Sequence, residues 1–106
     1  MDNQHKHIKG YRDLSQEEID LMNEIKEKGA ELLAVQAKVS AHLAHQDREK
    51  RAAAGYPRHG IWPKNDPGME LYRFDSAEPH RWAAIAKTDI QTGIMALVRA
   101  VAQPEI

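Results

Sequence analysis

The chain has 106 residues, 29% of them charged, with a formal net charge of −1 and no cysteine. This balance argues against a protein that coats duplex DNA, and the lack of cysteine excludes disulfides, thiolate metal sites and a cysteine nucleophile. No apolar run resembles a signal peptide or a membrane span, so we expect a cytoplasmic protein that contacts neither DNA nor membrane.

The length favours one domain over residues 1–106. Hydrophobic residues make up 42% of the chain, but they include 15 alanines, which leaves few large side chains for a core. A monomer of this size buries only a modest fraction of its surface. We therefore expect copies of the chain to associate with one another.

A glycine, a tyrosine and two cations lie directly before the first predicted helix, in the segment 7–14. Tyr11 can stack on a nucleotide base, while Lys9 and Arg12 can meet phosphate oxygens beside the free amides of the helix start. The alternative is that Tyr11 packs against protein while the two cations stay solvated. Composition alone favours this alternative.

The first helix is predicted to begin at Ser15, which forms a capping box with Glu18. Apolar residues then recur at helical spacing until about His45, which predicts an all-α protein with a first helix over about 15–45. Lys26 lies near the apolar stripe, and Gly29 removes bulk one turn later. Together they suggest a pocket between helices with one cation inside, although a lysine at a stripe edge usually extends its amine to solvent.

Residues 46–75 are rich in glycine, proline and aromatic side chains, and they predict a packed loop. A short strand or hairpin is an option near 69–74. A second helix is predicted over about 76–102, with Pro104 marking its end. The two helices would form a long antiparallel hairpin whose leftover apolar surface packs between subunits.

Arg81, Thr92 and Arg99 are further candidates for phosphate recognition on the second helix. Arginine suits paired hydrogen bonds to phosphate, but ordinary surface charge remains the better interpretation of each residue alone. His42 and His45 have the spacing of a metal-binding pair, yet no third ligand is evident, so we expect no metal site and no cofactor. The acids between Glu17 and Glu31 lie on a predicted solvated face, and no catalytic signature appears, so we do not expect an enzyme.

Two blocks of the sequence resemble the phage anti-CBASS cyclic-oligonucleotide sponge family. The first runs from His5-Lys6-His7-Ile8-Lys9-Gly10-Tyr11-Arg12 through Leu14-Ser15 to Leu21-Met22-Asn23-Glu24-Ile25-Lys26. The second runs from Arg81-Trp82 through Thr88 and Gln91-Thr92-Gly93 to Arg99-Ala100-Val101. The match covers about residues 4–45 and 80–104, and the first block is the more distinctive.

The resemblance implies a homohexamer that binds cyclic di- and trinucleotide messengers of bacterial antiviral cyclases between its subunits, without cleaving them. In that family a tyrosine before the first helix stacks on a base and a lysine in that helix contacts phosphate; Tyr11 and Lys26 match these positions. Residues 46–79 look longer than the family's usual turn, which puts the choice of ligand in doubt. A helical scaffold without a small ligand and a nucleotide-processing enzyme are the competing hypotheses.

Overall fold

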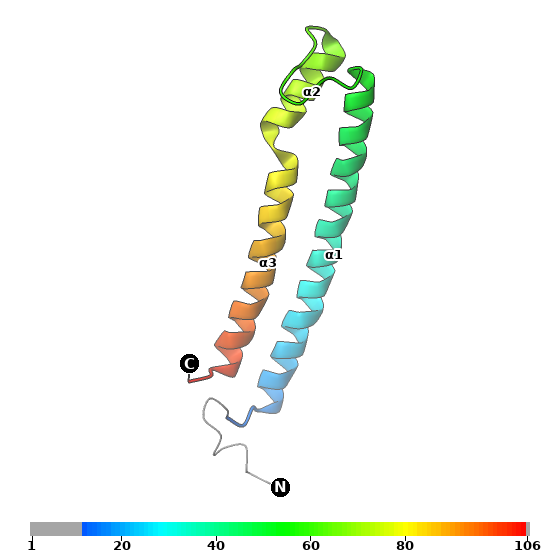
Figure 1. Ribbon diagram of the computed structural model, residues 1–106. Coiled ribbons are helices and arrows are strands. Elements are labelled where there is room, and N and C mark those ends of the chain that lie inside the picture. Colours follow the sequence, from blue (N-terminus) through cyan, green and yellow to red (C-terminus); the bar gives the residue numbers. More distant parts are fainter. Residues whose placement is uncertain (1–11, 106) are drawn as a thin grey trace. The chain divides into compact units, whose positions relative to one another are not determined.

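The computed structural model describes residues 12–105 and contains three helices in that range. They are α1 (Gln16–Ala53), α2 (Asp66–Ala77) and α3 (Pro79–Ala102), and α1 and α3 form a helical hairpin (Figure 1). The described residues contain no strand, so the predicted all-α class is confirmed. The suggested strand or hairpin at 69–74 is wrong, because those residues belong to α2.

The start of α1 is held by the predicted capping box. The Ser15 hydroxyl accepts a hydrogen bond from the Glu18 amide at 3.1 Å, and the Glu18 carboxylate accepts one from the Ser15 amide at 2.9 Å. Each side chain thereby satisfies a backbone donor that has no partner within the helix. The first helix therefore begins where the sequence predicts.

The end of α1 lies beyond the predicted boundary at about His45. The helix continues to Ala53 and ends in a Schellman motif, with Gly55 at φ 82° in the left-handed region. The amide of Gly55 donates to the Ala52 carbonyl, and the amide of Tyr56 donates to the Arg51 carbonyl at 2.8 Å. The predicted end of the helix is where the apolar pattern ends, whereas the helix itself ends just before Gly55.

The predicted loop 46–75 is too long at both ends, since α1 continues to Ala53 and α2 begins at Asp66. Asn65 caps this helix by accepting a hydrogen bond from the Gly68 amide at 2.9 Å, and Pro67 is tolerated in the first turn. Leu71 and Phe74 are three residues apart, so they lie on one face of α2, and both are buried. The same prolines and glycines that suggested a loop therefore belong partly to a helix start.

The break between α2 and α3 explains why the second long helix starts later than the predicted residue 76. Glu78 adopts φ 51° and is followed by Pro79, which cannot continue the α2 hydrogen-bond pattern but suits a helix start. Gln103 and Pro104 repeat this arrangement after α3, with Gln103 at φ 51°. The predicted end of the second long helix at about 102 is confirmed.

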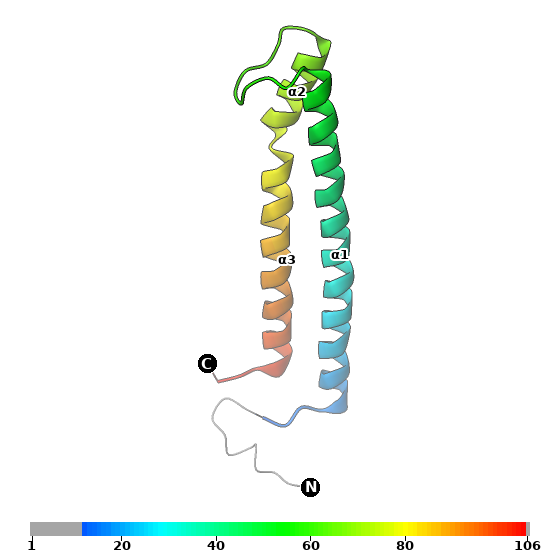
Figure 2. The same cartoon turned by 45° about the vertical axis from the view of Figure 1, so that its right-hand side comes forward.

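Contacts divide the chain into two compact units. One pairs the chain up to Leu33 with the chain from Thr88 onward, and the other is Ala34–Lys87. In the first unit, α1 and α3 run side by side (Figure 2). They approach closely at Gly29, where an added Cβ would lie 2.4 Å from the Ile94 Cδ1 atom. A single domain over 1–106 stays a prediction.

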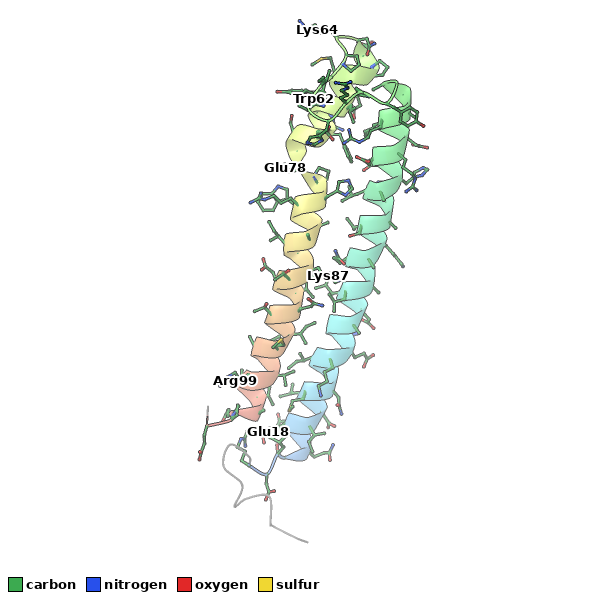
Figure 3. All side chains as sticks on the ribbon, viewed as in Figure 1. Glu18, Trp62, Lys64, Glu78, Lys87 and Arg99 are labelled. Atoms are coloured by element: carbon green, nitrogen blue, oxygen red, sulfur yellow. The ribbon has the colours of Figure 1, made fainter. Side chains whose placement is uncertain are left out.

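The unit Ala34–Lys87 is organised by polar contacts around α2. Asp75 accepts hydrogen bonds from the Arg51 guanidinium at 2.8 Å and from the Trp62 indole at 3.1 Å. The Trp62 ring also meets the Tyr72 ring edge-on at 4.9 Å between centroids. These contacts hold the loop after α1 against α2, where Trp62 is labelled in Figure 3.

The buried core of the described chain is small. Leu71 and Phe74 are the only large apolar side chains that are buried within residues 12–105, and α3 has no buried residue. Several large apolar side chains on α1 and α3 remain exposed: Ile19, Leu21, Leu32, Val35, Val39, Trp82, Met95 and Leu97. A surface of this kind is typical of a protein that packs against a partner.

We predict that Gly68→Ala lowers the free energy of unfolding by about 3 kcal/mol, because overpacking against fixed backbone is costly. A Cβ at residue 68 would lie 1.9 Å from the Pro63 carbonyl oxygen, so the loop must shift. Chemical denaturation at fixed protein concentration measures the change. The control Ser76→Ala, at an exposed position of the same helix, should stay within about 0.5 kcal/mol; equal midpoints for both variants would contradict the packing argument.

Candidate functional site

Two predicted site residues, Lys26 of α1 and Arg99 of α3, line one shallow groove of about 400 Å³. We call it the cationic groove; its lining is Lys26, Ile94, Met95, Val98, Arg99, Ala102 and Pro104. Within residues 12–105 neither cation is paired with an acid. Two unpaired cations beside an apolar wall suit a ligand that has both anionic groups and flat apolar faces.

Gly29 does not share this groove. It lines a second, mostly apolar groove of about 520 Å³ together with Leu21, Glu24, Ile25, Lys28, Leu32, Ile90, Gly93, Ile94 and Leu97. Ile94 lines both grooves and is also the side chain that packs over Gly29. The pocket that the sequence suggested around Lys26 and Gly29 is therefore two grooves in the single chain. Gly29 acts in this structure by permitting the close approach of α3.

Arg12 has a different environment from the one that the sequence suggested. Its Nε donates to the Ala102 carbonyl at 2.9 Å, and its Nη2 donates to the Val101 carbonyl at 2.7 Å. The same guanidinium is hydrogen-bonded and ion-paired with the Glu18 carboxylate. We call this set of contacts the Arg12 latch. It joins the start of α1 to the end of α3, where Glu18 and Arg99 are seen in Figure 3.

The latch has an electrostatic consequence. The Arg12 guanidinium, helped by the Ser15 amide, lowers the pKa of Glu18 from 4.5 to about 2. In the other unit, Arg73 and then Lys50 lower the pKa of Glu70 from 4.5 to about 2. Because both folded-state values are depressed, the stabilisation by these ion pairs is fully present above about pH 4.5. It is lost as the pH falls toward 2.

The remaining predicted site residues are spread over the chain. Arg81 belongs to the unit Ala34–Lys87, where its guanidinium lies 5.1 Å from the centroid of the Trp82 ring and 3.8 Å from Glu78. Thr92 is exposed on α3 and lines neither groove. Lys9 and Tyr11 lie outside the described residues. Among the candidates within residues 12–105, only Lys26 and Arg99 therefore line the same groove.

The histidines and acids of the described chain do not assemble into a metal centre. No group of three or more histidine, aspartate or glutamate side chains within residues 12–105 is arranged to hold a metal ion. His45 is 3.0 Å from Glu49, and His42 is exposed. None of the helices described is both long and apolar enough to cross a membrane.

Comparison with known proteins gives the family. The family model described as Acb2/Tad1, hairpin domain, matches residues 3–102. The chain belongs to this family. It is also 58% identical over 106 residues to Anti-CBASS protein 2 of Pseudomonas phage JBD67, and the match covers 99% of this chain and 98% of that protein. The resemblance that the sequence suggested is thereby confirmed.

The match with Anti-CBASS protein 2 also bears on the middle of the chain. Residues 46–79 looked longer than the family's usual turn, but the match with Anti-CBASS protein 2 spans nearly the whole of both chains. The segment is therefore shared with that relative and is not an insertion against it. Trp62 and Tyr72, two aromatic side chains of this segment, contact each other within the unit that contains α2.

Glu18 is the functional neighbour that sequence reasoning missed. It was recognised only as a helix cap, because its second partner, Arg12, is separated from it by a turn of chain whose course the sequence does not give. The carbonyl partners of Arg12 lie 89 and 90 residues away along the chain. No local signal could have identified them.

We predict that the Glu18 carboxyl titrates near pH 2, below the ordinary value of 4.5. Carbon-13 NMR of the glutamate side chains measures this directly. Arg12→Gln should return the Glu18 midpoint toward 4.5 while leaving Glu70, which depends on Arg73 and Lys50, unchanged. A Glu18 midpoint that does not respond to Arg12→Gln would show that the latch is absent in solution.

Proposed function

We propose that this protein binds and sequesters cyclic oligonucleotide second messengers without cleaving them, and so blocks CBASS antiviral signalling in the cytoplasm of the infected bacterium. The ligands would be cyclic dinucleotides such as 3′,3′-cGAMP, and cyclic trinucleotides as well. The observation that carries the proposal is the cationic groove, in which unpaired Lys26 and Arg99 lie beside apolar side chains. Membership in the Acb2/Tad1 family and the similarity to Anti-CBASS protein 2 support it.

The chemistry of the ligand matches the groove. A cyclic dinucleotide presents two bases and two phosphates in one compact ring. Stacking contributes about 1–3 kcal/mol per base and hydrogen bonds to charged groups about 1.5–3 kcal/mol each, while nanomolar affinity needs about 12 kcal/mol. These contributions suffice only when the site is already formed, since ordering it during binding would offset them. Lys26 and Arg99 lie on helices, which provide such order.

We propose that the working form is a homo-oligomer, expected to be a hexamer. The exposed apolar side chains of α1 and α3 support association, because a second copy can cover them. A two-fold interface also suits a two-fold ligand, since each subunit offers the same Tyr11 and Lys26. Association would turn the shallow cationic groove into an enclosed site.

The same exposed apolar surface also fits a helical scaffold that binds no small ligand, in which Lys26 and Arg99 would be ordinary surface charge. A nucleotide-processing enzyme is the third hypothesis, with His42, His45 and the acids of α1 as its candidates. Mass spectrometry of nucleotide released by heat from protein loaded with 3′,3′-cGAMP separates the three. Intact cyclic nucleotide supports sequestration, no retained nucleotide favours the scaffold, and cleaved product favours the enzyme.

We predict that Tyr11→Ala and Lys26→Ala each weaken binding of 3′,3′-cGAMP by at least tenfold without dissociating the oligomer, since each removes a base-stacking or charged contact. Calorimetry measures affinity, and analytical ultracentrifugation of the same samples measures assembly. Lys38→Ala, an exposed lysine elsewhere on α1, is the control and should bind like the wild type. Unchanged affinity in both test variants would overturn the site assignment.

Binding should weaken steeply with ionic strength, because salt screens attraction between exposed charges. The dissociation constant of 3′,3′-cGAMP, measured between about 50 mM and 500 mM salt, is expected to rise throughout the series. Lys26→Ala should show a shallower rise than the wild type, since one phosphate contact is gone. A wild-type dissociation constant that is flat across this range would contradict phosphate recognition.

A further inference from the structure

The Arg12 guanidinium has almost no hydrogen-bonding capacity left for a ligand. Its Nε hydrogen is taken by the Ala102 carbonyl, and its two Nη2 hydrogens are taken by the Val101 carbonyl and the Glu18 carboxylate. Nη1 also donates to Glu18, at 3.4 Å. A phosphate is recognised by a pair of adjacent N–H groups, and each such pair of Arg12 is already occupied in part. The Glu18 carboxylate also neutralises the guanidinium charge.

The contacts that occupy Arg12 join two helix ends. The carbonyls of Val101 and Ala102 belong to the last turn of α3, where backbone acceptors lack partners within the helix and a cation is favourable. Glu18 lies in the first turn of α1, where a carboxylate is favourable and also caps the Ser15 amide. One side chain therefore ties the negative end of α3 to the positive end of α1.

One of the two joined segments, the end of α3, lines the cationic groove, and the other begins the helix that carries Lys26. Ala102, whose carbonyl accepts from Arg12, lines the groove, and Arg99 stands one turn earlier on α3. Lys26 follows Glu18 by two turns of α1. The latch therefore joins the two helices that carry Lys26 and Arg99. Arg12 does not line the groove itself.

We propose that Arg12 is a positioning residue: with Glu18 it holds the last turn of α3 against the start of α1, and it thereby keeps Arg99 and Lys26 in the arrangement that binds the ligand. This inference rests on the proposed function and assigns Arg12 a different role from the phosphate contact that the sequence suggested. In metal sites, partners that orient a ligating residue from outside the site change affinity by about 10- to 100-fold, and we expect an effect at the lower end of that range here.

The two roles predict opposite effects for Glu18→Gln. If Arg12 contacted phosphate, removing the carboxylate would free its charge, and 3′,3′-cGAMP would bind more tightly. If Arg12 positions the groove, the same change loosens the latch, and binding weakens by about tenfold. The glutamine keeps an oxygen that can accept from the Ser15 amide, so the helix cap is retained. Glu17→Gln, at the neighbouring exposed acid of the same turn, removes the same charge outside the latch.

The experiment is calorimetry with 3′,3′-cGAMP on the wild type, Glu18→Gln, Glu17→Gln, Arg12→Gln and the exposed-arginine control Arg48→Gln, each checked by analytical ultracentrifugation. We expect weaker binding only for Glu18→Gln and Arg12→Gln. The double variant should bind no worse than the weaker single variant, because both changes break one latch. The salt dependence of Arg12→Gln should equal that of the wild type, since no phosphate contact has been removed.

Tighter binding by Glu18→Gln, or a salt dependence that is reduced by Arg12→Gln, would overturn the inference and restore Arg12 as a phosphate ligand. Wild-type affinity in both variants would reduce the latch to a purely structural role and also overturn it. Each of these results leaves the proposed function standing, since the wild type still binds. A wild type that binds no cyclic nucleotide would overturn the proposed function, and the inference would fall with it.

Discussion

The structure depends on a geometric constraint: a helix that packs against one neighbour can bury only a narrow strip of its surface. Between residues 12 and 105, α1 and α3 leave apolar side chains such as Leu32, Met95 and Leu97 exposed, and the buried apolar core consists of Leu71 and Phe74. The unburied surface gives copies of the chain a reason to associate. The proposed capture of a cyclic nucleotide at a seam between copies follows from that constraint.

Within one chain, the close packing of α1 and α3 is organised by two features of the same compact unit. Gly29 lets Ile94 approach the backbone of α1, which brings the two helices together at that position. The Arg12 latch joins the helix ends by placing a cation on the last carbonyls of α3 and a carboxylate on the first turn of α1. Both cations of the cationic groove lie between these two features in sequence, with Lys26 between Glu18 and Gly29 and Arg99 between Ile94 and Val101.

Local signals in the sequence predicted the two long helices, but they did not predict α2 or the contacts between distant residues. The Ser15–Glu18 capping box and the proline after α3 predicted helix ends, because their chemistry is contained in a few adjacent residues. The sequence does not predict α2, because Pro67 and Gly68 favour a loop, whereas Asn65 caps the helix that contains them. The role of Arg12 was missed because its carbonyl partners are close only after folding. Lys26 and Arg99 were both named, but their shared groove required the helix pairing.

Native mass spectrometry of the purified protein mixed with 3′,3′-cGAMP tests the central claim most directly, because one spectrum reports both subunit number and bound ligand. The account predicts an oligomer, expected to be a hexamer, that carries the intact cyclic nucleotide. A monomer that carries no nucleotide, at concentrations where the protein is folded, would contradict both the association of the exposed helix faces and the capture that depends on it.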